Sequence, residues 1–151
     1  MRTVIKNGTV VTAVDTFQGD VWIEGERIVA LTAPGVSNGM QADKTIDATG
    51  KLVMPGGIDA HTHLDMPFGG TTSSDDFETG TVAAAHGGTT TLIDFAIQTK
   101  GTSLREGLDT WHAKAEGKAA IDYGFHMIFT DVNPSTLKEM PGIVNEGVSS
   151  F

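Results

Sequence analysis

Two histidines separated by one residue are the side chains in this chain best suited to metal chemistry. His61 and His63 follow a short apolar run that begins after Pro55-Gly56-Gly57. Side chains two positions apart on a β-strand point to the same side, so both imidazoles are expected to face one site from one rigid edge. Imidazole nitrogens are common ligands of zinc. The spacing therefore predicts that His61 and His63 bind a divalent metal ion, in preference to being two polar residues near a turn.

The composition limits the partners of the chain. Its 151 residues suffice for one ordinary domain, and 39% apolar and 19% charged residues are typical of a globular protein. The net charge of −9 argues against a nucleic acid or an anionic membrane as a partner, because both call for a basic patch. No apolar run approaches the roughly 20 residues of a membrane span, and the start lacks the apolar segment of a signal peptide. A cytoplasmic location is therefore expected. Without cysteine, metal ligands must be histidine, carboxylate or less usual groups.

The first part of the chain, residues 1–54, is predicted to be a small all-β unit. Asn7-Gly8 and Gly25-Glu26 each lie between two β-rich runs. Asn-Gly is a strong signal for a two-residue turn, and it predicts a hairpin between Thr3–Lys6 and Thr9–Thr12. A second hairpin is predicted at Gly25-Glu26, and two further short strands complete the unit.

Strands and helices alternate in residues 55–151. Strands are predicted over 57–63, 89–95, 123–129 and from 148 onward, and helices over 75–87, 104–119 and 134–147. Such alternation indicates parallel β/α units. Three units and the start of a fourth indicate an incomplete β/α barrel, because a complete one needs eight units and about 250 residues.

Several longer motifs carry a family resemblance that covers essentially the whole chain. They are Pro55-Gly-Gly-Ile-Asp-Ala-His-Thr-His-Leu-Asp-Met-Pro-Phe68, Ser74-Asp-Asp-Phe-Glu-Thr-Gly80, Gly87-Gly-Thr-Thr-Thr91 with Asp94-Phe95, and Asp122-Tyr-Gly-Phe-His126. With them the sequence resembles the D-hydantoinase/dihydropyrimidinase family of metal-dependent amidohydrolases. The two histidines alone would specify only the superfamily, whereas residues 64–68 and 74–77 are more specific.

This resemblance implies a (β/α)8 TIM barrel, of which the chain holds the first three units and the start of strand 4, with a small N-terminal β-sandwich domain. It also implies two divalent metal ions, usually zinc, with His61 and His63 as the first two ligands and a carboxylated lysine as the bridge. In the family, that lysine follows a motif like Gly147-Val-Ser-Ser-Phe151. The lysine and the catalytic aspartate are therefore expected after Phe151, and no catalytic residue within the chain. A polypeptide ending there would be inactive, and we expect the protein to continue past a modified lysine.

The reaction implied by the resemblance is hydrolytic ring opening of 5-monosubstituted hydantoins or dihydropyrimidines to N-carbamoyl amino acids. Metal ions supply activated water and polarise the ring carbonyl in such reactions. Met66 and Phe68 match a loop that forms part of an apolar gate for the substrate in hydantoinases, although packing of the loop alone is the alternative. Family members are commonly homotetramers.

Other polar residues near the predicted site have competing interpretations. Asp59 lies two residues before His61, so its side chain is expected on the same side of the strand as the two histidines. A structural role is favoured over metal ligation for this residue. Asp94 at the end of its strand could either orient a ligand or cap a loop. His126 lies among apolar residues and is interpreted as a satisfied, buried histidine, whereas His86 and His112 are expected on helix surfaces.

Other functions stay open as alternatives. A sister ring-opening enzyme, such as an allantoinase or dihydroorotase, is one. Dihydroorotase is disfavoured, because its carboxylate substrate calls for an arginine soon after the histidines, and no Lys or Arg occurs between His63 and Lys100. A non-catalytic, dihydropyrimidinase-related interaction protein is another, and retention of both histidines argues against it.

Overall fold

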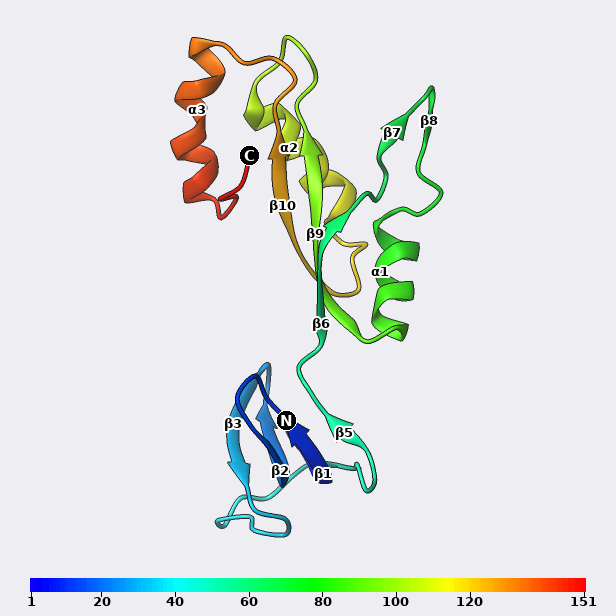
Figure 1. Cartoon of the computed structure of the whole chain (residues 1–151), viewed down its shortest axis with the longest axis vertical. Coiled ribbons are helices and arrows are strands. Elements are labelled where there is room, and N and C mark those ends of the chain that lie inside the picture. Colours follow the sequence, from blue (N-terminus) through cyan, green and yellow to red (C-terminus); the bar gives the residue numbers. More distant parts are fainter. The chain divides into compact units, whose positions relative to one another are not determined.

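The computed structural model describes residues 1–151, which divide into two compact units, Met1–Pro55 and Gly56–Phe151. Figure 1 shows the two units and labels their strands and helices, apart from β4. None of the three helices is long and apolar enough to cross a membrane.

The first unit is one mixed β-sheet. Its strands are β1 (Arg2–Val11), β2 (Thr16–Glu24), β3 (Arg27–Thr32), β4 (Lys44–Asp47) and β5 (Leu52–Val53). The order is β3-β2-β1-β4, and β5 also pairs with β1. The hairpin predicted at Gly25-Glu26 is confirmed, since β2 and β3 are antiparallel with Glu24 opposite Arg27. A sandwich needs two sheets, whereas this unit has one, so the expected β-sandwich stays a prediction.

The hairpin predicted at Asn7-Gly8 is wrong. Strand β1 runs through both residues, and its pairing with β2 shifts between Ile5 and Gly8, which is a β-bulge. Asn7 adopts a φ of 63°, and its N–H donates to Oδ1 of the buried Asp20 over 2.9 Å. A Cβ on Gly8 would lie 2.5 Å from Cγ2 of Val53. The Asn-Gly pair therefore suits a bulge beside a close neighbour, not a turn.

The second unit is built from β/α units, as the alternation predicted. A parallel sheet has the order β10-β9-β6, with β6 (Gly57–Thr62), β9 (Thr89–Ile97) and β10 (Asp122–Ile128). The helices are α1 (Phe77–His86), α2 (Leu104–Ala115) and α3 (Pro134–Asn145), and a short hairpin joins β7 (Pro67–Phe68) to β8 (Thr71–Thr72). Capping boxes at Asp76, Ser103 and Asn133 begin the helices. Each cap satisfies backbone N–H groups that the first helical turn leaves free.

Two predicted elements differ from the structure. Helix α2 ends at Ala115 rather than Ala119, because Glu116 leaves the helical conformation with ψ 126° and Gly117 has a φ of 73°. The expected fourth strand from Val148 is not formed. Its Ser150 carbonyl accepts a hydrogen bond from the backbone N–H of Met127 over 3.0 Å, but no ladder follows. The segment therefore lies beside β10 without being a strand of the sheet.

The two faces of β9 have different environments. Leu92, Asp94, Ala96 and Gln98 are buried, whereas the residues between them are half-buried. Leu92 and Ala96 share a core cluster with Leu104, Leu108 and Trp111 of α2. Successive residues of a strand point to opposite faces, so Phe95 belongs to the face away from this helix.

Candidate metal-binding site

His61 and His63 converge at the carboxyl end of β6. Their Nε2 atoms lie 3.2 Å apart, and the ring planes are perpendicular, with centroids 5.0 Å apart. Two nitrogens bound to one tetrahedral zinc ion at about 2.0–2.1 Å would be separated by about 3.3 Å. The separation in the structure therefore fits two ligands of one metal ion, and both side chains are exposed to a potential ligand.

The pair supplies two of the four donors that a tetrahedral zinc ion takes. No group of three or more His, Cys, Asp or Glu side chains in residues 1–151 is arranged to hold a metal ion. Oδ1 of Asp59 accepts a hydrogen bond from the backbone N–H of His61 over 3.1 Å. This contact agrees with a structural role for Asp59, and the preference for that role over metal ligation stays a prediction.

A β-bulge in β6 lies at the histidines, and sequence reasoning missed it. Asp59 pairs with Leu92 and Thr62 pairs with Asp94, so three steps along β6 match two steps along β9. The extra residue falls in the stretch that contains His61. Bulges change the direction of neighbouring side chains and often lie next to active sites. The simple alternation expected for this strand is therefore modified where the imidazoles meet.

Phe95 provides an aromatic surface for the histidines. Its ring centroid lies 4.5 Å from that of His61 and 5.1 Å from that of His63. The ring of His126 packs on Phe95 as well, at 4.7 Å. In the sequence, Phe95 stands out only as part of the Asp94-Phe95 motif, and nothing in the sequence identifies the two histidines as its neighbours.

His126 is held at both ring nitrogens. Its Nε2 lies 2.9 Å from the carbonyl oxygen of Ala60, and its Nδ1 contacts the hydroxyl of Ser150. Since a carbonyl oxygen can only accept, Nε2 is the donor in the first contact. Both ring nitrogens of His126 therefore have partners, as expected, but the prediction that it is buried is wrong, because the side chain is half-buried. His86 and His112 lie on the surfaces of α1 and α2, also as expected.

The carboxylate of Asp94 binds the backbone on both sides of His63. Its Oδ2 accepts hydrogen bonds from the Thr62 hydroxyl at 3.0 Å and from the Leu64 N–H at 2.7 Å. Its Oδ1 accepts from the Phe95 N–H at 2.7 Å and from Nε1 of Trp111 at 3.1 Å. Of the two interpretations left open for Asp94, the capping of a loop agrees with these contacts, and the loop is the one that follows β6.

Helix α2 also holds the next residue of that loop. Nζ of Lys114 donates to the carbonyl oxygen of Asp65 over 2.6 Å and lies 4.0 Å from the ring centroid of Trp111. Burial lowers the pKa of Lys114, and the nearby charges of Asp65 and Asp94 partly oppose this shift. Asp65 itself has a φ of 51°. The loop therefore leaves the histidines in a defined conformation.

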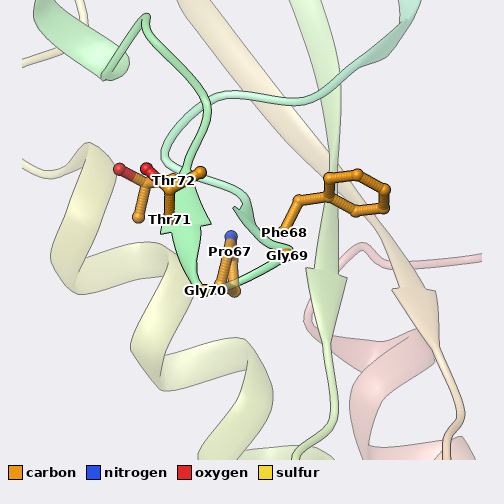
Figure 2. Close-up of a pocket in the computed structure, with 6 residues that line it drawn as sticks. All are labelled: Pro67, Phe68, Gly69, Gly70, Thr71 and Thr72. Carbon is orange, nitrogen blue, oxygen red and sulfur yellow. The ribbon is translucent and has the colours of Figure 1, made fainter.

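Met66 and Phe68 lie on the following hairpin. Met66 is half-buried. Its N–H donates to the hydroxyl of Ser73 over 3.0 Å, and its carbonyl oxygen accepts from the Ser73 N–H over 2.8 Å. Phe68 is 76% exposed. Figure 2 shows its ring pointing away from the side chains of Thr71 and Thr72, with which it lines a shallow pocket. A large aromatic ring is thus presented to solvent on the loop that follows the histidines.

Comparison with known proteins places these features in a family. Residues 52–147 match the model of the amidohydrolase family. The chain is 62% identical over 152 aligned residues to a D-hydantoinase of Streptomyces coelicolor. The alignment covers 99% of this chain and 32% of that protein. It is 51% identical to a D-hydantoinase of Geobacillus stearothermophilus, with 100% of the chain and 32% of that protein covered.

A solved structure gives the same result. The crystal structure of dihydropyrimidinase from Brevibacillus agri superposes with a TM-score of 0.92 at 54% identity, covering 99% of this chain and 32% of that one. The chain spans 32% of the length of the curated relatives named above. It belongs to the amidohydrolase family, and the relatives named here, which it resembles within that family, are D-hydantoinases and a dihydropyrimidinase.

Proposed function

We propose that this chain is the N-terminal part of a metal-dependent hydrolase that opens cyclic amides. The substrates are 5-monosubstituted hydantoins, dihydropyrimidines or both, and the products are N-carbamoyl amino acids. The convergence of His61 and His63, with Nε2 atoms 3.2 Å apart at the end of β6, is the observation that carries this proposal. The names of the relatives, D-hydantoinase and dihydropyrimidinase, favour this function over that of an allantoinase, a dihydroorotase or a non-catalytic interaction protein.

The proposed cofactor is a pair of zinc ions. His61 and His63 would hold one ion, and a carboxylated lysine that follows Phe151 would bridge the two, with the catalytic aspartate also in that later part of the protein. Such ions supply Lewis-acid activation of water and of the ring carbonyl. The role of this chain is to orient the two imidazoles. Phe95 contacts both rings. Nε2 of His126 donates a hydrogen bond to the carbonyl oxygen of Ala60, the residue before His61.

Met66 and Phe68 are proposed to contact the substituent of the ring substrate. An exposed aromatic ring near a metal site can bury an apolar substituent, since burial of apolar surface is favourable by about 25 cal/mol per Å². The proposed whole protein has a complete (β/α)8 barrel with an N-terminal β-sandwich, of which residues 1–54 form one part and residues 55–151 begin the barrel. We further propose that it is a cytoplasmic homotetramer.

Ring opening of dihydrouracil and of a 5-monosubstituted hydantoin by the purified full-length protein tests this function. Activity should be lost with a chelator and restored by zinc together with bicarbonate, which a lysine carbamate requires. The ratio of the two rates gives the substrate preference. Absence of hydrolysis with either substrate after zinc and bicarbonate are restored would overturn the proposal.

A further inference from the structure

We infer that Asp94 is a positioning residue that fixes the metal-binding end of β6 from the opposite face of the sheet. This inference rests on the proposed metal-binding role of His61 and His63. Asp94 is fully buried, and it touches neither imidazole. It acts through the backbone, because Thr62 and Leu64, the neighbours of His63 on both sides, donate hydrogen bonds to the same oxygen, Oδ2.

The position of Asp94 on its strand explains how it reaches both sides of His63. Asp94 lies on the buried face of β9, with α2, whereas the next residue, Phe95, packs against the imidazoles. The N–H of Phe95 donates to Oδ1 of Asp94. One carboxylate therefore ties the backbone that carries His63 to the backbone that carries the aromatic surface beneath it.

The chemistry of the four contacts requires a carboxylate. All four partners of Asp94 are donors: one hydroxyl, two backbone N–H groups and the indole N–H of Trp111. A carboxylate offers two acceptor oxygens, whereas an Asn amide places an NH2 group at one of them. An Asn NH2 group in place of Oδ1 would face the N–H groups of Phe95 and Trp111, and in place of Oδ2 it would face the N–H of Leu64. These three groups can only donate, whereas the Thr62 hydroxyl could turn toward the carbonyl oxygen of Ile93.

Gln98, the residue that follows the last residue of β9, provides a matched comparison. It is also fully buried, and its amide forms four hydrogen bonds, with Thr102 and Asp131 as acceptors and the N–H groups of Thr130 and Asp131 as donors. None of its partners flanks a histidine. A change at Gln98 therefore reports on the general cost of disturbing a buried polar group at the end of β9.

The test compares Asp94→Asn with Gln98→Glu in the full-length protein. Zinc affinity is measured by competition with a chromophoric chelator, and the cobalt-substituted protein is examined by visible absorption, which reports on ligand geometry. We expect zinc affinity to fall by about tenfold or more in Asp94→Asn, as for other residues that orient metal ligands, with altered cobalt bands. Gln98→Glu should lower the melting temperature while retaining the wild-type affinity and spectrum.

A milder variant, Thr62→Val, keeps the test decisive if Asp94→Asn does not fold. It removes one donor to Asp94 and preserves the shape of the side chain, and it should weaken zinc binding several-fold. Wild-type affinity and cobalt spectrum in both the Asp94 and Thr62 variants, or in Thr62→Val alone if the other is unfolded, would overturn the inference while leaving the proposed function intact. A wild-type protein that binds no metal would overturn the inference about Asp94 and the proposed function together.

Discussion

The aromatic ring of Phe95 lies against the imidazole of His61, with centroids 4.5 Å apart and planes inclined by 54°. The same ring contacts His63 and His126. An imidazole that must present Nε2 to a metal ion has to be held in one rotamer. Phe95 restricts that motion for both histidines at once, because it occupies the space next to each ring.

Replacing Phe95 with leucine should therefore weaken metal binding without abolishing it. Contacts between aromatic rings contribute about 0.5–1.5 kcal/mol beyond area burial, so a loss of about twofold to tenfold in zinc affinity is expected. Titration with zinc in competition with a chelator measures it. Phe125→Leu is the control, because the ring of Phe125 lies in the buried core cluster and packs on Tyr123 at 5.5 Å. Equal losses in the two variants would contradict a specific role for Phe95.

Removal of one imidazole should have a larger effect. We expect His63→Ala to lose most of its bound zinc and its chelator-sensitive hydrolysis, since the proposed site then lacks one of its ligands. His112→Ala serves as the control, because His112 lies on the surface of α2. Metal content per subunit is measured after exhaustive dialysis. Wild-type zinc content in His63→Ala would show that His63 is not a ligand.

Shortening Phe68 should change substrate preference. The exposed ring of Phe68 offers apolar surface to a substituent, and full burial of such a side chain contributes about 1.5–3 kcal/mol. In Phe68→Ala, kcat/KM for a hydantoin with a large apolar 5-substituent should fall by about tenfold or more, whereas dihydrouracil, which has no substituent, should be hydrolysed at the wild-type rate. Thr72→Ala on the same hairpin controls for loop disturbance. A uniform loss for both substrates would mean that Phe68 only packs the loop.

Close packing of α2 on the sheet predicts opposite effects at two helical glycines. A Cβ on Gly107 would lie 2.9 Å from Cε of Met127 and 3.1 Å from the backbone oxygen of Ile97. The backbone cannot move away easily, so the added methyl group should cost about 1–3 kcal/mol through overpacking. This cost should exceed the gain of about 1 kcal/mol from the better helix propensity of alanine. Gly107→Ala should therefore lower the melting temperature. A Cβ on Gly142 in α3 meets nothing within 4 Å, so Gly142→Ala should raise the melting temperature. A higher melting temperature in Gly107→Ala would contradict this packing.

The parts of the structure that depend on local sequence were predictable. The caps at Asp76, Ser103 and Asn133 follow from side chains that bond amides two or three residues away, and the β/α alternation follows from local apolar patterns. The convergence of His61 and His63 also follows from short spacing.

The features that were missed depend on distant partners. The Asn7-Gly8 bulge requires Asp20 and Val53, and nothing in residues 7–8 distinguishes a bulge from a turn. The indole N–H of Trp111, on the following helix, is a partner of Asp94 that the position of Asp94 in the sequence does not indicate. The bulge in β6 is a property of its register with β9. Such features are set by tertiary packing, which local periodicity does not encode.

The cap of α1 should make stability depend on pH. Hydrogen bonds from the backbone N–H and then the hydroxyl of Thr79 lower the pKa of Asp76 below its usual value of 3.8. Because the pKa in the folded state is below that in the unfolded state, the carboxylate contributes stability above the unfolded pKa, and this contribution is lost as pH falls through the folded pKa.

Asp76→Asn isolates this contribution, since asparagine is also a good N-cap but does not titrate in this range. The melting temperature of the wild type should exceed that of Asp76→Asn at about pH 6, and the difference should shrink as the pH falls from about 5 to about 3. Thermal unfolding followed by circular dichroism gives both values. Glu78→Gln, in the same helical turn, controls for the loss of a negative charge near the helix N-terminus, because no hydrogen bond from Thr79 reaches that carboxylate. A difference between wild type and Asp76→Asn that stays constant over this pH range would show that the Asp76 charge does not stabilise α1.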